Sequence, residues 1–155
     1  MGGLRKLHGV TCRTNEAGRL AGYFLSGIFY QGRGVMSITG FHVHVYFDVE
    51  TRAAASRVRD GLAEHFDVEL GRWHEKSVGP HPKWMYQVKF APEEFGKLVP
   101  WLMLHHEGLD VLIHPETGDD VKDHTERALW LGTKLDLNIE FLRKVNVKVQ
   151  GGKTA

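Results

Sequence analysis

The strongest constraint on the fold is a seven-residue segment, residues 42–48, in which polar rings alternate with apolar side chains as His-Val-His-Val-Tyr-Phe-Asp. A period of two is typical of a strand, so we expect His42, His44 and Tyr46 on one face of a sheet. Two imidazoles spaced in this way lie about 6.6 Å apart along a strand, at roughly 3.3 Å per residue, and their rings can lean toward one ion. The segment predicts a metal site, and a pair of half-buried histidines bonded to neighbouring groups is the alternative.

Composition narrows the class of protein. The 155 residues fit one domain with a substantial core, and 42% hydrophobic with 25% charged residues is ordinary for a globular chain. The formal charge is only +1 and the basic residues are dispersed, so no nucleic-acid partner is expected. Cys12 is the single cysteine, which excludes an internal disulfide and a thiolate-rich zinc site. Any metal ligands must therefore be His, Asp or Glu.

The early part of the chain offers little periodicity. Residues 1–35 are rich in glycine and read as a variable extension with a short strand around Tyr23–Tyr30. That apolar run is too short to cross a bilayer, and no convincing cleavage pattern follows it, so we expect a cytoplasmic protein without a membrane partner. We expect a single catalytic domain at residues 36–145 and a C-terminal tail at residues 146–155.

From residue 36 the apolar spacing switches repeatedly between that of strands and that of helices. The resulting β-α-β-β-α-β order is typical of the ferredoxin-like α+β fold, an antiparallel sheet with two helices on one face. Two further elements are expected after this unit, and the last of them would pair with the sheet or with another subunit. The expected elements are strands at 36–48, 68–76, 84–90 and 110–114, helices at 51–66 and 92–108, then a helix at 120–131 and a strand at 135–141.

This topology predicts where the histidines meet. In the expected strand order, 4-1-3-2, the first strand lies between a parallel third strand and an antiparallel fourth strand. His42 opens the first strand, His81 precedes the third and His114 closes the fourth, so all three would reach one edge of the sheet. The polar face that carries them needs a cover, which we expect to be the C-terminal segment or a partner subunit.

The ligand set stays open at this point. Two histidines with one carboxylate are typical of non-haem Fe(II) oxygenases, whereas three histidines with one open position suit a zinc hydrolase. His124 is expected either to line the pocket or to be a core histidine, and Asp123 with Arg127 is expected to form a surface ion pair. The candidate carboxylates are Glu116, Asp119, Asp120, Asp123 and Glu140.

The segments that carry these residues also resemble a known family. The strings are HVHVYFD from His42, GPHPKWMYQVKF from Gly79 and HPETGDDVKDHTERALWLG from His114, followed by LDLNIEFL. From about Gly40 to Leu142 they are similar to the DOPA 4,5-dioxygenase family. The resemblance implies a ferredoxin-like homodimer that uses non-haem Fe(II) and O₂ to open a catechol ring outside its two hydroxyls. The motif histidines carried over are His42, His44, His81, His114 and His124.

The resulting hypothesis is an Fe(II)-dependent extradiol dioxygenase acting on a substituted, DOPA-like catechol. His42, His81 and His114 are the predicted metal ligands, and His44 and His124 the predicted acid–base residues. Zinc or another divalent metal is expected to be able to replace the iron. The alternatives are a zinc-dependent hydrolase or lyase on the same histidines, a non-catalytic dimer that binds a metal or a phenolic ligand, and a metal-free polar dimer interface.

Overall fold

The computed structural model describes residues 4–7, 10–14, 20–23 and 37–151, and the chain forms two compact units, Met1–Val35 and Met36–Ala155. In the first unit, β1 (Leu4–Leu7), β2 (Val10–Thr14) and β3 (Leu20–Tyr23) form an antiparallel sheet in that order. Beyond Tyr23, the strand expected around Tyr23–Tyr30 lies outside the described residues.

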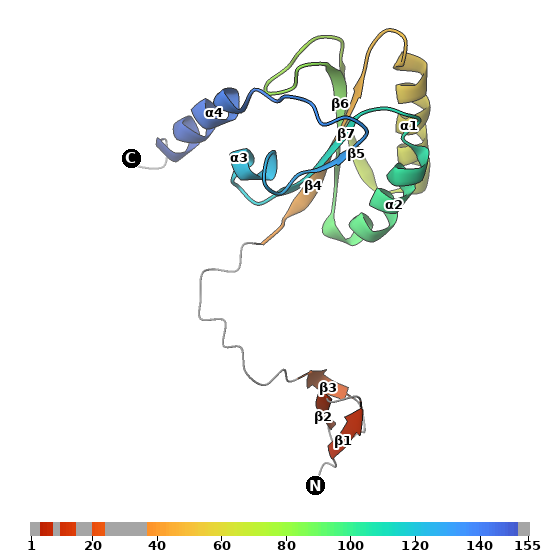
Figure 1. Ribbon diagram of the computed structural model, residues 1–155, viewed down its shortest axis with the longest axis vertical. Coiled ribbons are helices and arrows are strands. Elements are labelled where there is room, and N and C mark those ends of the chain that lie inside the picture. Colours follow the sequence, from red (N-terminus) through yellow and green to blue (C-terminus); the bar gives the residue numbers. More distant parts are fainter. Residues whose placement is uncertain (1–3, 8–9, 15–19, 24–36, 152–155) are drawn as a thin grey trace. The chain divides into compact units, whose positions relative to one another are not determined.

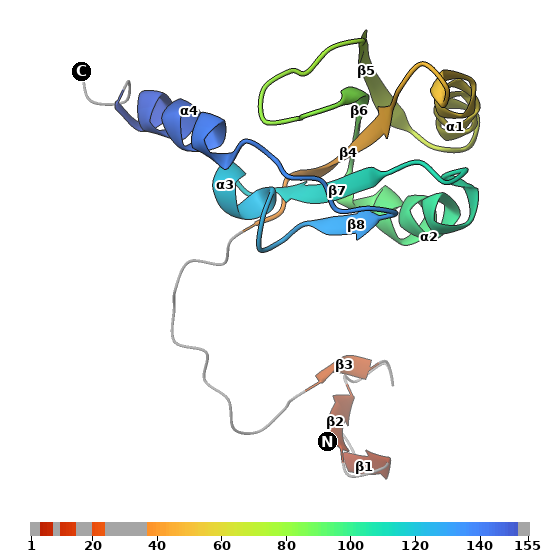
Figure 2. The same ribbon diagram turned by 45° about the horizontal axis from the view of Figure 1, so that its top comes forward.

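The second unit is a five-stranded antiparallel sheet with two long helices on one face (Figure 1). Its strand order is β5-β6-β4-β7-β8, which confirms the ferredoxin-like α+β class and adds one edge strand. The turned view places α1 and α2 together on the same side of the sheet (Figure 2). The elements are β4 (Gly40–Phe47), α1 (Arg52–His65), β5 (Val68–His74), β6 (Trp84–Phe90), η1 (Pro92–Glu94), α2 (Phe95–His105), β7 (Val111–Glu116), α3 (Asp120–Asp123), β8 (Leu129–Leu131) and α4 (Ile139–Gly151).

One expectation about strand direction is wrong: β6 runs antiparallel to β4, not parallel to it. His42 is opposite Lys89, and Phe47 is opposite Trp84, so the start of β6 meets the end of β4. The physical reason is that a crossover helix returns the chain to the end of the sheet at which the preceding strand began. The β5–β6 hairpin, by contrast, reverses the direction of the chain. The residues just before β6 therefore begin at the opposite end of the sheet from His42.

The two faces of the sheet follow the predicted alternation. Val43, Val45 and Phe47 of β4 lie in the large core beneath the helices, where α1 contributes Ala55, Val58 and Leu62. On the other face, Tyr46, Met85 and Leu112 form a smaller apolar cluster. Ala128, Trp130, Leu135 and Leu137 pack against that cluster, so the C-terminal segment covers part of the histidine-bearing face as expected.

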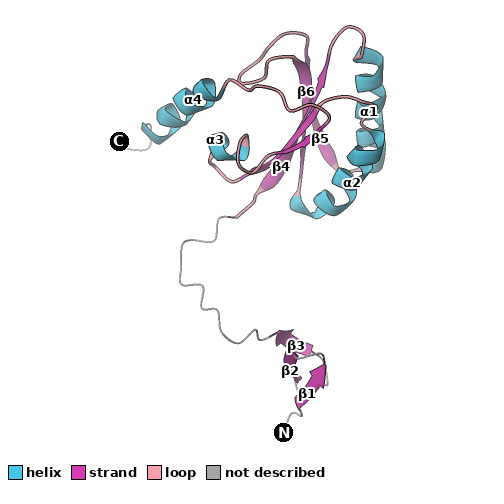
Figure 3. Ribbon diagram, in the orientation of Figure 1, coloured by secondary structure: helices cyan, strands magenta, loops and turns pink. Residues whose placement is uncertain are grey.

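The C-terminal elements differ from the sequence-based expectation. The helix expected at 120–131 ends at Asp123, and Leu129–Leu131 instead form β8, which pairs with Val111–Ile113 of β7. The strand expected at 135–141 does not form, since the segment before α4 is a loop (Figure 3). Leu135 and Leu137 instead pack against the apolar cluster on the sheet face without joining the ladder. The position expected to end the catalytic domain, residue 145, falls inside α4.

No helix within the described residues is both long enough and apolar enough to cross a membrane.

Two leucines on α2 provide a test of this packing. Leu102 is fully buried, whereas Leu104, two positions later, is 81% exposed. We expect Leu102→Ala to lower the free energy of unfolding by about 2–5 kcal/mol, because the truncation leaves a cavity between helix and sheet. The matched Leu104→Ala variant is expected to change it by less than about 0.5 kcal/mol. Urea denaturation followed by circular dichroism measures both, and equal losses would contradict the packing.

Candidate metal centre

Five histidines gather on the sheet face opposite α1 and α2, and together they form the histidine cluster: His42, His44, His81, His114 and His124. His42 and His44 project from β4, and His114 of β7 is the cross-strand neighbour of His42. His44, His81, His114 and His124 are each at most 9% exposed, which is unusual for a polar side chain. The sheet alone therefore brings three imidazoles together, and two loops contribute the other two.

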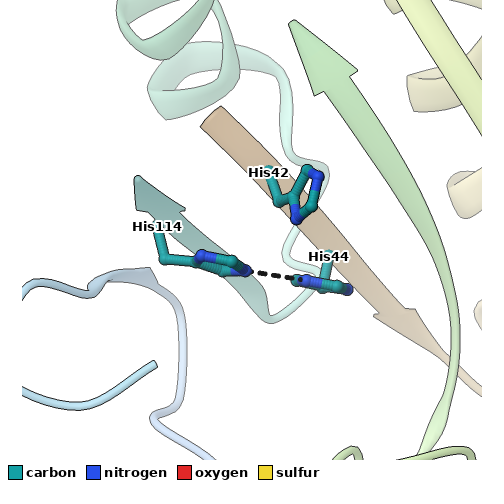
Figure 4. A group of neighbouring side chains, drawn as sticks. All are labelled: His42, His44 and His114. Carbon is teal, nitrogen blue, oxygen red and sulfur yellow. Dashed lines mark hydrogen bonds between the residues drawn. The ribbon is translucent and has the colours of Figure 1, made fainter. Parts of the chain in front are cut away.

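The three sheet histidines, here called the outer triad, converge as Figure 4 shows. One potential ligand atom from each of His42, His44 and His114 lies within 4.8 Å of the others. The Nε2 atoms of His44 and His114 are only 3.1 Å apart, and their rings are nearly parallel at 10°. Two nitrogens bound to one metal at about 2.1 Å would stand at a comparable separation.

A second set of three, here called the buried triad, consists of His44, His81 and His124, whose ligand atoms also lie within 4.8 Å of one another. All three members are buried. His44 therefore belongs to both triads. Each triad mixes predicted ligands with predicted acid–base residues: His42 and His114 fall in the outer triad, and His81 in the buried one.

His81 reaches the cluster by a route that the sequence did not predict. Because β6 is antiparallel to β4, His81 does not arrive at the shared edge; instead the β5–β6 loop folds back over the sheet face. A backbone hydrogen bond from His81 N to Val78 O, 3.1 Å long, tightens this loop, and Asn138 N donates to Pro80 O at 2.8 Å. The imidazole consequently lies 4.1 Å from the His44 ring, centroid to centroid.

His124 is positioned by the short α3 and by a buried carboxylate next to it. Its ring lies 3.9 Å from that of His114. Asp123 accepts hydrogen bonds from Thr117 N and Oγ1 at 2.8 and 2.7 Å, and from Arg127 Nη1 at 2.8 Å. The expected Asp123–Arg127 pair is thus present, but its expected surface location is wrong, because Asp123 is only 1% exposed. The hydrogen bonds to Asp123 fix the turn that directs His124 into the cluster.

Of the five candidate carboxylates, Glu116 is the one that forms an ion pair with a cluster histidine. Its Oε1 lies 3.2 Å from His42 Nε2, and its Oε2 lies 2.9 Å from Lys89 Nζ. Asp119 accepts from Lys122 N and caps α3, while Glu140 pairs with Arg143 on the surface. Asp120 and Asp123 line the same cavity as the histidines.

Hydrogen bonds to carbonyl oxygens fix the tautomers of two imidazoles. His114 Nδ1 is 3.0 Å from Pro115 O, and His124 Nδ1 is 2.8 Å from Asp120 O. A carbonyl oxygen only accepts, so both Nδ1 atoms must carry hydrogen and both Nε2 atoms must present a lone pair. With His114 Nε2 as an acceptor, His44 Nε2 donates to it. His44 Nδ1 is then a buried nitrogen without a partner among the described residues.

Burial keeps the cluster uncharged. Loss of hydration lowers the pKa of His81 and of His114 to about 3, and it lowers the pKa of His44 well below its ordinary value, with the neighbouring imidazoles adding to the effect. Burial also lowers the pKa of His42 and of His124, although Glu116 opposes the shift at His42. Neutral imidazoles are the form that binds metals.

The cluster lines a cavity of about 410 Å³, which also contains Thr39, Gln87, Gly118 and Leu142. A cavity of this size suits a small organic molecule. Neutral imidazoles, a neighbouring carboxylate and the partnerless nitrogen of His44 fit a first-row divalent metal such as iron or zinc. The cluster can therefore hold a metal ion beside a small-molecule cavity.

Two residues of the site were not given a role from sequence. The strand alternation predicts the face on which Tyr46 lies, but its hydroxyl contact with His81 Nδ1, 2.7 Å long, depends on the path of a loop that has no periodicity. Thr117 follows β7 and carries no pattern of its own. Its partner Asp123, six residues later, is the only signal that could have indicated it.

Comparisons with known proteins agree with this geometry. The model of the Dopa 4,5-dioxygenase family matches residues 41–141. An uncharacterized 21.2 kDa protein of Botryotinia fuckeliana is 32% identical over 68% of the chain, and a DOPA 4,5-dioxygenase of Amanita muscaria is 30% identical over 68%. The match spans 64% and 50% of the length of these curated relatives, respectively.

A crystal structure from Nostoc punctiforme also matches. That protein, provisionally described as a dioxygenase, is 63% identical, and the match covers 70% of this chain and 94% of the other with a TM-score of 0.69. The region matched by the family model, residues 41–141, contains all five residues of the histidine cluster.

The lowered pKa values predict how the stability of the metal-free protein depends on pH. In the unfolded chain these histidines return to about 6.5 and take up protons below that pH, while His81 and His114 stay neutral in the folded chain down to about pH 3. The unfolded state then binds more protons, so stability falls as the pH drops below about 6.5. We expect up to about 1.4 kcal/mol per pH unit for each such histidine.

Urea denaturation between about pH 7.5 and pH 5 measures this slope. His81→Gln should make it shallower, whereas His65→Gln, at the exposed end of α1, should leave it unchanged. A slope that does not respond to His81→Gln would contradict the neutral, buried state of this imidazole.

Proposed function

Because the chain belongs to the DOPA 4,5-dioxygenase family, we propose that it is an Fe(II)-dependent extradiol dioxygenase. The proposed substrate is a substituted catechol of the DOPA type. One C–C bond of the ring breaks outside the two hydroxyl groups, and both atoms of O₂ enter the ring-opened product. The observation that carries the proposal is the convergence of five uncharged imidazoles beside a cavity of about 410 Å³.

The chemistry of the ion and that of the protein are separable. Fe(II), when bound, supplies open coordination positions and the electron transfer that couples a catechol to O₂. Three of the five histidines would hold it, and His44 is the member that both triads share. Buried imidazoles are suited to this task because they do not need to lose a proton before binding.

The remaining residues would orient the substrate and move its protons. Loss of a catechol proton requires a base, and His42 is suited to the role because Glu116 lies 3.2 Å away and stabilises a protonated ring. His42 is also the cluster histidine nearest to solvent, with 18% of its side chain exposed. Leu142 and Pro80 add apolar surface to the lining of the cavity.

The test is anaerobic reconstitution with Fe(II), followed by O₂ uptake on a panel of catechols that includes DOPA. We expect one O₂ consumed per catechol, and a product whose mass increases by two oxygen atoms. The same protein loaded with Zn²⁺ should consume no O₂, because zinc has no redox chemistry. Recovery of unchanged catechols from the iron-loaded protein would indicate a binding protein, and zinc-supported hydrolysis would indicate a hydrolase.

His44 provides a second test, independent of turnover. We expect His44→Ala to weaken Fe(II) or Zn²⁺ binding by at least about 100-fold, because the variant removes a ligand common to both triads. His105→Ala, at the exposed end of α2, is the matched control and should bind the metal as the unmodified protein does. Equilibrium dialysis with metal analysis measures both, and undiminished binding by His44→Ala would refute a metal centre in this cluster.

A further inference from the structure

The hydroxyl of Tyr46 contacts a histidine of the buried triad, and the apolar packing of the tyrosine ring does not require this contact. It lies on β4 two residues after His44, is 1% exposed, and holds its hydroxyl 2.7 Å from His81 Nδ1. Its ring stacks on Trp130 of β8, with centroids 5.8 Å apart and planes inclined by 13°. Met85 and Leu112, on the two strands that flank β4, complete the apolar surroundings of the ring. The hydroxyl is therefore held in place from several strands.

The His81 ring depends on such a partner. The surrounding loop is anchored through its backbone, at Val78 and Pro80, and these bonds do not set the rotation of the imidazole. A metal-binding histidine normally donates its second ring N–H to a fixed acceptor, which selects the tautomer and aims the other nitrogen. When His81 Nδ1–H donates to the hydroxyl oxygen of Tyr46, His81 presents the lone pair of Nε2 to an ion.

The two ring nitrogens of His44 differ in their partners, and this difference favours one triad over the other as the metal site. Its Nε2 is bonded to His114 Nε2, whereas its Nδ1 is buried without a partner among the described residues. An ion in the outer triad that used Nε2 would leave Nδ1 without a partner, which is costly in a buried site. An ion in the buried triad can use Nδ1, and every outer nitrogen is then bonded: His44 to His114, His81 to Tyr46 and His124 to Asp120 O.

The geometry points to the buried triad, His44, His81 and His124, as the metal ligands, with Tyr46 as the positioning residue that fixes His81. This inference rests on the proposed function only in assuming that the cluster holds a metal. It assigns His114 to the support of His44, and His42 with Glu116 to the rim of the cavity. Tyr46 acts through His81 and does not touch the ion.

Metal affinity measured without catechol or O₂ tests this assignment. Co²⁺ is titrated into the metal-free protein, and its visible absorption reports both affinity and ligand geometry. We expect Tyr46→Phe, which keeps the stacking on Trp130, to weaken Co²⁺ binding by about 10–100-fold and to alter the spectrum. Glu116→Gln, which changes the outer partner of His42, should alter the affinity by less than about threefold, far below that effect.

Tyr86→Phe is the matched control for the loss of a buried hydroxyl. Tyr86 is fully buried on the other face of the sheet, where its hydroxyl donates to Ala55 O at 3.0 Å, so its removal should leave Co²⁺ affinity unchanged. A pair of ligand variants gives the same information if Tyr46→Phe does not fold: His81→Ala should abolish binding, and His42→Ala should preserve it.

The opposite pattern, in which Glu116→Gln and His42→Ala weaken Co²⁺ binding while Tyr46→Phe and His81→Ala do not, would assign the ion to the outer triad and overturn the inference. Equal effects of both sets, or no effect of Tyr46→Phe and His81→Ala, would overturn it as well, as would failure of the unmodified protein to bind Co²⁺. Expected Co²⁺ results without O₂ consumption by the iron-loaded protein would instead retain this assignment and reject the dioxygenase.

Discussion

The pairing of β4 with β6 on one side and β7 on the other is the constraint on which the site depends. Because successive residues of β4 point to opposite faces, a single strand supplies apolar side chains to the helices and His42, His44 and Tyr46 to the cavity. A slip of one residue would exchange the two faces completely. Val43, Val45 and Phe47, each at most 1% exposed, therefore fix the register that aligns His42 with His114.

Gathering several imidazoles away from water carries a cost, and the surroundings offset it locally. Charged imidazoles so close together would repel one another, and burial favours the neutral form of each. The backbone carbonyls of Pro115 and Asp120 then satisfy one nitrogen of His114 and of His124. The remaining ring nitrogens carry lone pairs that face a common space, as the ligands of a metal-binding site do.

The sequence predicts the elements that follow a periodic apolar pattern. It does not predict features that depend on a single tertiary contact. The two-residue alternation locates β4 and β6 closely, and the face assignment of Tyr46 and the histidines follows from it. The direction of β6 depends on how the hairpin and crossover helices combine, which no local period contains. Leu129–Leu131 forms a strand only because β7 offers a free edge, and three apolar residues alone do not distinguish a strand from a helix turn. Asp123 is buried through partners at Thr117 and Arg127 that no spacing rule selects.

Pro115 affects how readily the protein associates with itself at high concentration. β8 covers β7 only as far as Ile113, so β7 extends beyond its neighbour toward Glu116. A strand edge without a neighbour can accept foreign strands, which is a route to aggregation, although the burial of Pro115 already restricts access to this edge. Proline has no amide hydrogen to offer, and the Pro115 carbonyl is already engaged by His114. The residue that orients an imidazole inside the cavity thus also makes the neighbouring edge a poor template for self-association.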